Sequence, residues 1–160
     1  MSIKPEWCAK IASGRKTVEI RKTIPKLPTP FRVNIYCTEP NTTDPHKYLE
    51  THSEDGHIYK CNGNVFAEFV CDWIRREPEV AEGLVDVCLS QTSCVEAGDI
   101  IRYANGKMIY SWHISDLVIY NKPKELSEFK HCGVNYHFNP PITRPPQSWC
   151  YVEEQTEEVK

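Results

Sequence analysis

The short basic segment "SGRKTVEIRK" (residues 13–22) contains the side chains best suited to chemistry, namely Lys16, Thr17, Glu19 and Arg21. An arginine such as Arg21 can bind a phosphate or a base edge with two parallel hydrogen bonds, and Lys16 can bind phosphate as a point charge. Glu19 can accept a hydrogen bond from the exocyclic amine of a base such as cytosine. The set therefore suits a nucleotide. The alternative is a solvated strand face on which Glu19 is ion-paired with Arg21 or Lys16.

The charge of the chain is unevenly distributed. Residues 1–36 hold eight lysines and arginines against two glutamates, a balance of +6, which leaves −9 for the rest of a chain whose net charge is −3. Such asymmetry indicates a local anionic ligand rather than adhesion along duplex DNA, for which a wholly basic domain is expected. Charge alone leaves a solvated, lysine-rich face open as the alternative.

The length of the chain predicts a single domain. The lack of long apolar segments predicts no membrane partner. We expect one domain over residues 1–152, with an irregular insertion at 40–64, followed by an acidic tail at 153–160. No apolar run approaches the roughly 20 residues that span a bilayer. The first ten residues, "MSIKPEWCAK", lack the apolar core of a signal peptide, so we expect a cytoplasmic protein.

The eight cysteines are scattered, and most lie in apolar segments where they are expected to pack as core residues. No C-x-x-C motif occurs, so the strong signature of a zinc site is missing. A loose grouping of His131, Cys132, His137 and Cys150 has metal-ligand chemistry, but scattered residues of this kind usually bind nothing. We predict neither a metal nor another cofactor.

The elements that must position the basic segment follow from local signals. After a short strand in "SIKP", Pro5 fits the first turn of a helix, and Gly14 is placed to end that helix in the left-handed conformation. Alternation in "KTVEIRK" then predicts a strand, with Thr17, Glu19 and Arg21 on one face and the apolar residues on the other.

The rest of the chain reads as short strands with few helices. Further strands are expected in "FRVNIYCTE", "VFAEFVCDWIRRE", "KMIYSWHISDLVIY" (with a bend at Ser115–Asp116) and "ITRPPQSWCYVEE". A capping box formed by Ser93 and Glu96 predicts a helix over "VEAGDIIRYANG" that ends near Asn105, and "KPKELSEF" predicts one helical turn. This order predicts an α+β fold, most simply a small twisted β-barrel with flanking helices.

These segments resemble a known family. "SIKPEWCAKIASGRKTVEIRK" followed by "FRVNIYC" is similar to the opening of the ASCH domain family of the PUA-like superfamily. "FAEFVCD", "YSWHISDLVIY" and "RPPQSWCYVEE" resemble the form in small bacterial and bacteriophage members. The resemblance covers nearly the whole chain except the insertion and the tail. It implies a small barrel that binds nucleic acid, chiefly RNA, in a cleft beside the first helix.

In this family the K-T-x-E-x-R strand lines the cleft, which implies that the polar face of that strand is a cleft wall, with Lys16 at its rim. Aromatic side chains over a basic groove commonly stack the bases of single strands. The residues expected to contact nucleic acid are therefore Lys4, Lys16, Thr17, Glu19, Arg21, Tyr36, Trp112, His113, Arg144 and Ser148. Trp112 and His113 are the best candidates for an aromatic wall, because alternation sends one inwards and the other outwards. Trp73 is expected in the core.

The resemblance also raises the question of catalysis. The acetylcytidine amidohydrolases of the family are implied to use the motif's lysine, a threonine two residues before its arginine, and a glutamate from a later helix. Lys16 matches the lysine, but Glu19 stands at the threonine position, and Glu96 is the candidate for the later glutamate.

Three hypotheses follow. The first is a binding module for RNA or a modified nucleotide, with no chemistry. The second is an enzyme on nucleosides or RNA, an amidohydrolase or a ribonuclease, with Lys16 and Glu19 as catalytic residues. The third is a protein-interaction domain with the 40–64 insertion as its contact surface.

Overall fold

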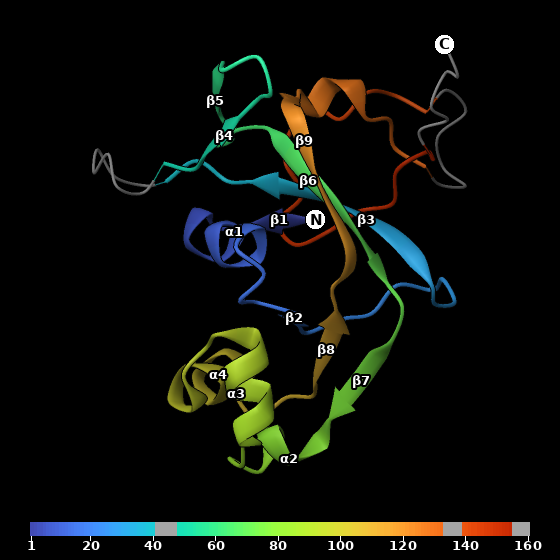
Figure 1. Cartoon of the computed structure of the whole chain (residues 1–160). Helices are drawn as coiled ribbons and strands as arrows, with labels where there is room; N and C mark the ends of the chain where they lie inside the picture. The colour runs from blue at the N-terminus through green and yellow to red at the C-terminus, as the bar shows by residue number, and fades with distance from the viewer. Residues whose placement is uncertain (41–47, 133–138, 155–160) are drawn as a thin grey trace. The chain divides into compact units, whose positions relative to one another are not determined.

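Figure 1 shows the computed structural model of the chain, which describes residues 1–40, 48–132 and 139–154. The chain forms two compact units. The first unit contains Met1–Cys8, Asn34–Ala67 and Ile119–Lys160, and the second contains Ala9–Val33 and Glu68–Val118. Both helices and sheets are present, so the α+β prediction is confirmed. No helix among the described residues is long and apolar enough to cross a membrane.

A four-stranded sheet has the order β1-β3-β6-β9. Its strands are β1 (Ser2–Ile3), β3 (Phe31–Cys37), β6 (Val65–Cys71) and β9 (Ser115–Lys124). The parallel pair of β1 and β3 aligns Ser2 with Tyr36. In the first unit, Tyr36, Val65, Phe129 and Ile142 form a buried cluster. Closure of the sheets into a barrel stays a prediction.

The predicted insertion at 40–64 contains regular structure. Strands β4 (Glu50–His52) and β5 (Ile58–Lys60) pair as an antiparallel hairpin. Residues 41–47 of the insertion lie outside the described residues. After a 3₁₀ turn, η2 (Leu126–Glu128), the expected strand in "ITRPPQSWCYVEE" is absent from the described residues. Only isolated bridges occur there, such as that between His131 and Val152, because this segment is rich in prolines that cannot donate to a strand ladder.

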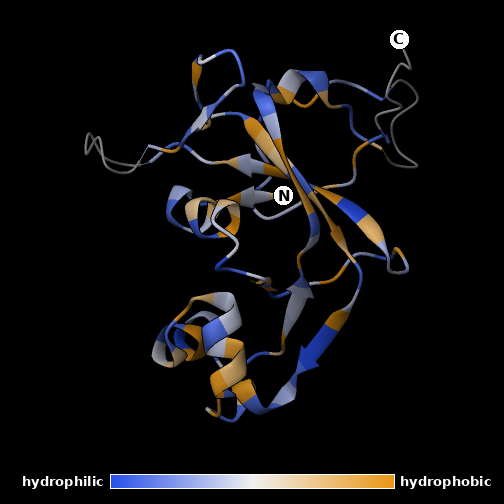
Figure 2. Ribbon diagram, viewed as in Figure 1, coloured by the Kyte–Doolittle hydropathy of each residue, from blue (hydrophilic) through white to orange (hydrophobic). Residues whose placement is uncertain are grey.

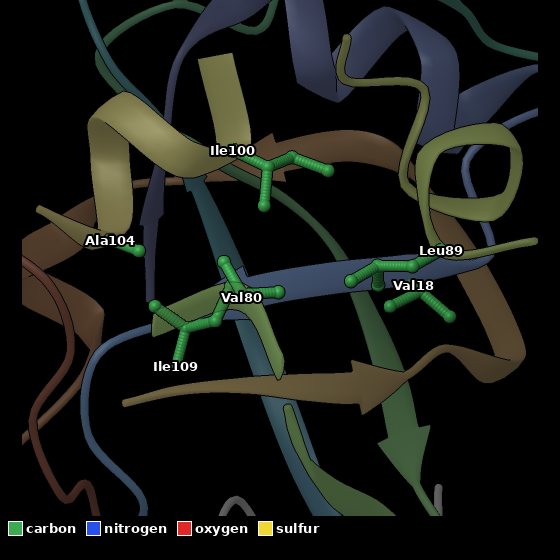
Figure 3. Packing of buried hydrophobic residues seen from close by; sticks show 6 residues of the cluster. All are labelled: Val18, Val80, Leu89, Ile100, Ala104 and Ile109. Carbon is green, nitrogen blue, oxygen red and sulfur yellow. The ribbon is translucent and has the colours of Figure 1, made fainter. Parts of the chain in front are cut away.

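The second unit contains an antiparallel three-stranded sheet of order β2-β8-β7. Its strands are β2 (Val18–Arg21), β7 (Ile74–Glu77) and β8 (Ile109–His113). Helices α2 (Pro78–Ala81), α3 (Val87–Ser93) and α4 (Ala97–Ala104) lie beside these strands (Figure 1). Figure 3 shows the buried cluster that joins helices and strands, which consists of Val18, Val80, Leu89, Ile100, Ala104 and Ile109.

The helix ends follow local chemistry, with one correction. Helix α1 (Pro5–Ala12) begins at Pro5 as predicted, and Gly14 follows it with φ +72°. Helix α4 ends at Asn105, also as predicted, and Asn105 adopts the left-handed conformation. The capping box of Ser93 and Glu96 is wrong, because Ser93 is the last residue of α3. Glu96 does stand at the N-cap of α4, but its side chain makes no capping hydrogen bond.

Two segments that were each predicted as one strand form two strands. "VFAEFVCDWIRRE" divides into β6 and β7, and "KMIYSWHISDLVIY" divides into β8 and β9. The predicted bend near Ser115–Asp116 is confirmed, because Asp116 adopts φ +46° just after the break. These interruptions turn β7 and β8 into a short pair in the second unit, next to β2.

Candidate functional site

The backbone between α1 and β2 is held at several points. The N–H of Lys16 donates to the carbonyl of Lys10 at 3.0 Å, and the N–H of Thr17 donates to the carbonyl of Thr92 at 2.9 Å. The carbonyl of Thr17 accepts from Ile114 at 2.9 Å. Thr17 therefore connects the end of α3 with Ile114, the residue just after β8, and β2 enters the sheet from a fixed point.

Lys16, Glu19 and Arg21 form a buried charge triad in the second unit. Lys16 Nζ lies 3.1 Å from Glu19 Oε2, and Arg21 Nη2 lies 2.9 Å from Glu19 Oε1. The three residues are 2%, 7% and 8% exposed, respectively. Both cations thus converge on one carboxylate, as the ion-paired alternative predicted, but the face is buried rather than solvated.

The expected position of Lys16 at a rim is wrong. Its ammonium also donates to the carbonyl of Ser93 at 2.8 Å, and the ammonium of Lys10 donates to the carbonyl of Cys94 at 3.3 Å. These carbonyls stand at the C-terminal end of α3, where the helix dipole favours positive charge. Lys16 therefore has two anionic or partly negative partners, which compensate the loss of water on burial.

The strand register extends the triad across the sheet. Arg21 on β2 stands opposite Tyr110 on β8, and Tyr110 stands opposite Arg76 on β7. Directly opposed residues of antiparallel strands point to the same face. Arg21, Tyr110 and Arg76 therefore form one row, which we call the arginine row. Exposure increases along it, from the buried Arg21 through the half-buried Tyr110 to the exposed Arg76.

The arginine row lies on the face of the sheet opposite to that of Val18 and Ile109, and Tyr103 of α4 comes within electrostatic reach of its buried end at Arg21. Val18 and Ile109 belong to the cluster that packs against α2–α4. Alternation along β2 and β8 puts Arg21 and Tyr110 on the other face. The side chain of Arg76 is exposed. Among the described residues it makes no hydrogen bond and no salt bridge.

Trp112 and His113 alternate as predicted. Trp112 is 2% exposed and packs edge-to-face on Phe31, with ring centroids 5.6 Å apart. His113 points the other way, and its Nδ1 lies 2.6 Å from Asp72 Oδ1. This hydrogen bond is the main cause that lowers the pKa of Asp72. The prediction that Trp73 is a core residue is wrong, because Trp73 is 40% exposed and stacks on His113.

The other predicted contact residues belong to the first unit. Lys4 and Arg144 are exposed there, and Ser148 accepts a backbone hydrogen bond from Ser2 at 2.9 Å. Tyr36 is buried, and burial, with help from Glu39, raises the pKa of its hydroxyl. The ten predicted residues are thus divided between the units. Lys16, Thr17, Glu19, Arg21, Trp112 and His113 lie together in the second unit.

Among the described residues there is no group of three or more His, Cys, Asp or Glu that could hold a metal ion. His137, one member of the grouping that the sequence suggested, lies outside those residues. Cys8, Cys37, Cys61 and Cys71 are buried as free thiols, as expected of core cysteines, whereas Cys88 and Cys132 are exposed.

Solved structures share the architecture of this chain. An ASCH structure from Zymomonas mobilis is similar over 99% of this chain and 87% of its own, with a TM-score of 0.61 and 20% sequence identity. This chain has the fold of an ASCH protein. A variant of the same Zymomonas ASCH protein with a tyrosine-to-phenylalanine substitution matches 92% of this chain and 84% of its own. Its TM-score is 0.58, and its identity is 22%. The resemblance found in the sequence is confirmed at the level of the ASCH fold.

Comparison of the sequence alone gives nothing further, since no family model matches it and no curated protein matches it. This chain therefore shares the ASCH fold at low sequence identity. Sequence reasoning missed Trp73, Tyr110 and Arg76. Alternation in "YSWH" places Tyr110 on the same face as Trp112, but only the strand register could bring Arg76 beside it.

Proposed function

We propose that this chain is a nucleic-acid-binding module that recognises single-stranded RNA or a modified nucleotide through the arginine row. The observation that carries the proposal is the register that places Arg21, Tyr110 and Arg76 side by side on three neighbouring strands. A tyrosine between two arginines combines a surface for stacking a base with two cations for phosphate or for a base edge. The ASCH fold and the family resemblance of the sequence support the same function.

The charge triad gives the row a rigid end. Glu19 fixes Arg21 through Nη2, and Lys16 holds the second oxygen of the same carboxylate. A cation whose orientation is already fixed loses less side-chain entropy when it binds a ligand. The exposed Arg76 is then the first contact for an approaching phosphate, and the more buried Arg21 selects what reaches the inner end of the row.

Hydrolysis has less support in this geometry. The family's catalytic threonine is replaced by Glu19, and each oxygen of that carboxylate already contacts a cation. Glu96, the candidate for the second acid, stands at the exposed N-cap of α4. Recognition without turnover is therefore the function that we propose.

The test is fluorescence anisotropy with a labelled single-stranded RNA of about 12 nucleotides, within the usual site sizes of such modules. Arg76→Ala should weaken binding and lower the slope of log K against log salt by about 0.7 to 1. Arg102→Ala is the matched control. Arg102 is an exposed arginine on α4 in the same unit, paired only with its helical neighbour Asp99 within the described part of the chain.

Three results would contradict the proposal. They are no binding of RNA by the unmodified protein at low salt, binding that does not depend on salt, and equal effects of the two arginine substitutions. Incubation with N4-acetylcytidine is the parallel assay. Release of acetate that depends on Lys16 would establish an amidohydrolase instead.

A further inference from the structure

We propose that Trp73 and His113 form a platform on which a base of the bound strand stacks, as a second contact beyond the arginine row. This inference rests on the proposed function, because it concerns the same ligand. It assigns a role to Trp73, the exposed tryptophan that the sequence placed in the core. We call Trp73 and His113 together the stacking platform.

The platform consists of two nearly parallel rings. The ring centroids of Trp73 and His113 are 4.8 Å apart, and their planes are inclined by only 8°. Trp73 nevertheless remains 40% exposed. A tryptophan that stacks on one neighbour and still exposes so much of its surface presents a flat aromatic area to solvent. Stacking on such a surface is how single-stranded nucleic acid is commonly held without reading its sequence.

The imidazole ring of His113 and the backbone that carries the indole of Trp73 are fixed before any ligand binds. Asp72 holds the imidazole of His113 through the contact between Oδ1 and Nδ1 at 2.6 Å. The N–H of His113 also donates to the carbonyl of Trp73 at 3.1 Å, which continues the β7–β8 ladder by one pair. The thiol of Cys71 donates to the same carbonyl at 3.4 Å. A surface ordered in this way loses little entropy when a base stacks on it.

Arg75 and Arg76 can supply phosphate contacts beside the platform, next to the carboxylates of Asp72 and Glu77. Arg75 stands two residues beyond Trp73, so the alternation of the strand places both on the same face. Its Nε contacts Glu77 at 2.8 Å, and its side chain is 53% exposed. Arg76 follows on the opposite face of β7, which is an edge strand of its sheet. Figure 2 shows that β7 is hydrophilic beyond its first residue. The platform and the arginine row thus lie on opposite faces of one edge strand, and an RNA strand that contacts both has to pass around this edge.

The chemistry of the platform predicts a distinctive pattern of effects. Removal of the ring should weaken binding of the labelled RNA by about 5- to 150-fold, the range measured for loss of one base–aromatic stack. It should leave the salt slope unchanged, because no phosphate contact is lost. Trp73→Phe keeps an aromatic face and should retain most of the affinity. Saturating RNA should quench part of the tryptophan fluorescence of the unmodified protein.

The experiment compares Trp73→Ala, Trp73→Leu and Trp73→Phe in the full chain with the same labelled RNA, at two salt concentrations. Trp73→Leu keeps apolar bulk without an aromatic face, so it reports on stacking even if Trp73→Ala does not fold. Tyr48→Ala is the matched control, because Tyr48 is an aromatic residue of similar exposure, 39%, in the first unit. It should not alter binding.

Failure of this inference can be told apart from failure of the proposed function. If Trp73→Leu binds as the unmodified protein does while Arg76→Ala weakens binding, the platform is wrong and the arginine row stands. If Trp73→Leu lowers the salt slope as Arg76→Ala does, Trp73 acts through the charged residues, and stacking is again wrong. If the unmodified protein binds no RNA, both proposals are overturned together.

Discussion

Replacement of Glu19 by glutamine is the sharpest test of the charge triad. The substitution preserves the shape of the side chain but removes the charge that holds Lys16 and Arg21. Two buried cations would then face a neutral amide, which does not offset their positive charge. Because Lys16 is 2% exposed and Arg21 is 8% exposed, water can replace little of what is lost. We therefore expect a large loss of folding stability.

The magnitude follows from the two contacts. At 3.1 and 2.9 Å, and with an effective dielectric constant of about 20, each contact is worth about 5 kcal/mol of Coulomb attraction before the cost of desolvation is subtracted. Removal of one partner of a buried pair typically costs about 3–5 kcal/mol, because a buried charge is left uncompensated. We expect Glu19→Gln to lower the free energy of unfolding by about this amount, which is a large share of the stability of a small domain.

Urea denaturation followed by circular dichroism measures this change. Asp99→Asn is the matched control, since Asp99 also pairs with an arginine but is exposed on α4. An exposed pair of this kind is worth about 0–1 kcal/mol, so the control should be close to neutral. Glu19→Gln could instead lower the free energy of unfolding no more than Asp99→Asn does, at an unchanged m-value. That result would show that the triad does not act as a buried ion network.

Two further predictions concern groups outside the charge triad. Burial raises the pKa of Cys61 to about 11 and of Cys71 to about 12, so their stabilising contribution is complete below pH 9 and is lost as the pH rises through these values. Denaturation at several alkaline pH values should show a fall in the free energy of unfolding with pH, and Cys71→Ala should reduce its slope by about 1.4 kcal/mol per pH unit. Thermal denaturation should show that Gly14→Ala destabilises the protein by about 1–2 kcal/mol, because φ is +72° there. Gly98→Ala, in α4 with open space around it, should stabilise it by about 0.4–1 kcal/mol, and the same sign for both glycine substitutions would contradict this reasoning.

The sequence predicted those features that depend on neighbours along the chain. Pro5, Gly14 and Asn105 mark helix ends because each has a backbone preference that acts locally. The strand that carries Glu19 and Arg21 was found by its alternation, and the ASCH fold by resemblance. Alternation also predicted correctly that Trp112 and His113 point in opposite directions.

What the sequence could not predict depends on partners far away along the chain. Lys16 is buried because the carbonyl of Ser93, 77 residues later, accepts a hydrogen bond from its ammonium, and no local pattern indicates that contact. Trp73 lies in an apolar run that reads as one buried strand. The run breaks before β7, at an edge of the sheet, and the tryptophan is left on the surface. The arginine row required the register of three strands, which only tertiary pairing defines.

Substitutions at the two ends of the arginine row are expected to differ in their effect on folding stability. Arg21 is tied to Glu19 and buried, so any substitution there changes folding and binding together. Arg76 is exposed, and the described residues give its side chain no salt bridge, so its substitution should leave the free energy of unfolding within about 0.5 kcal/mol. A loss of RNA affinity in Arg76→Ala at unchanged stability therefore assigns binding to the row itself. The same loss in an Arg21 variant would not, because it could equally follow from a disrupted triad.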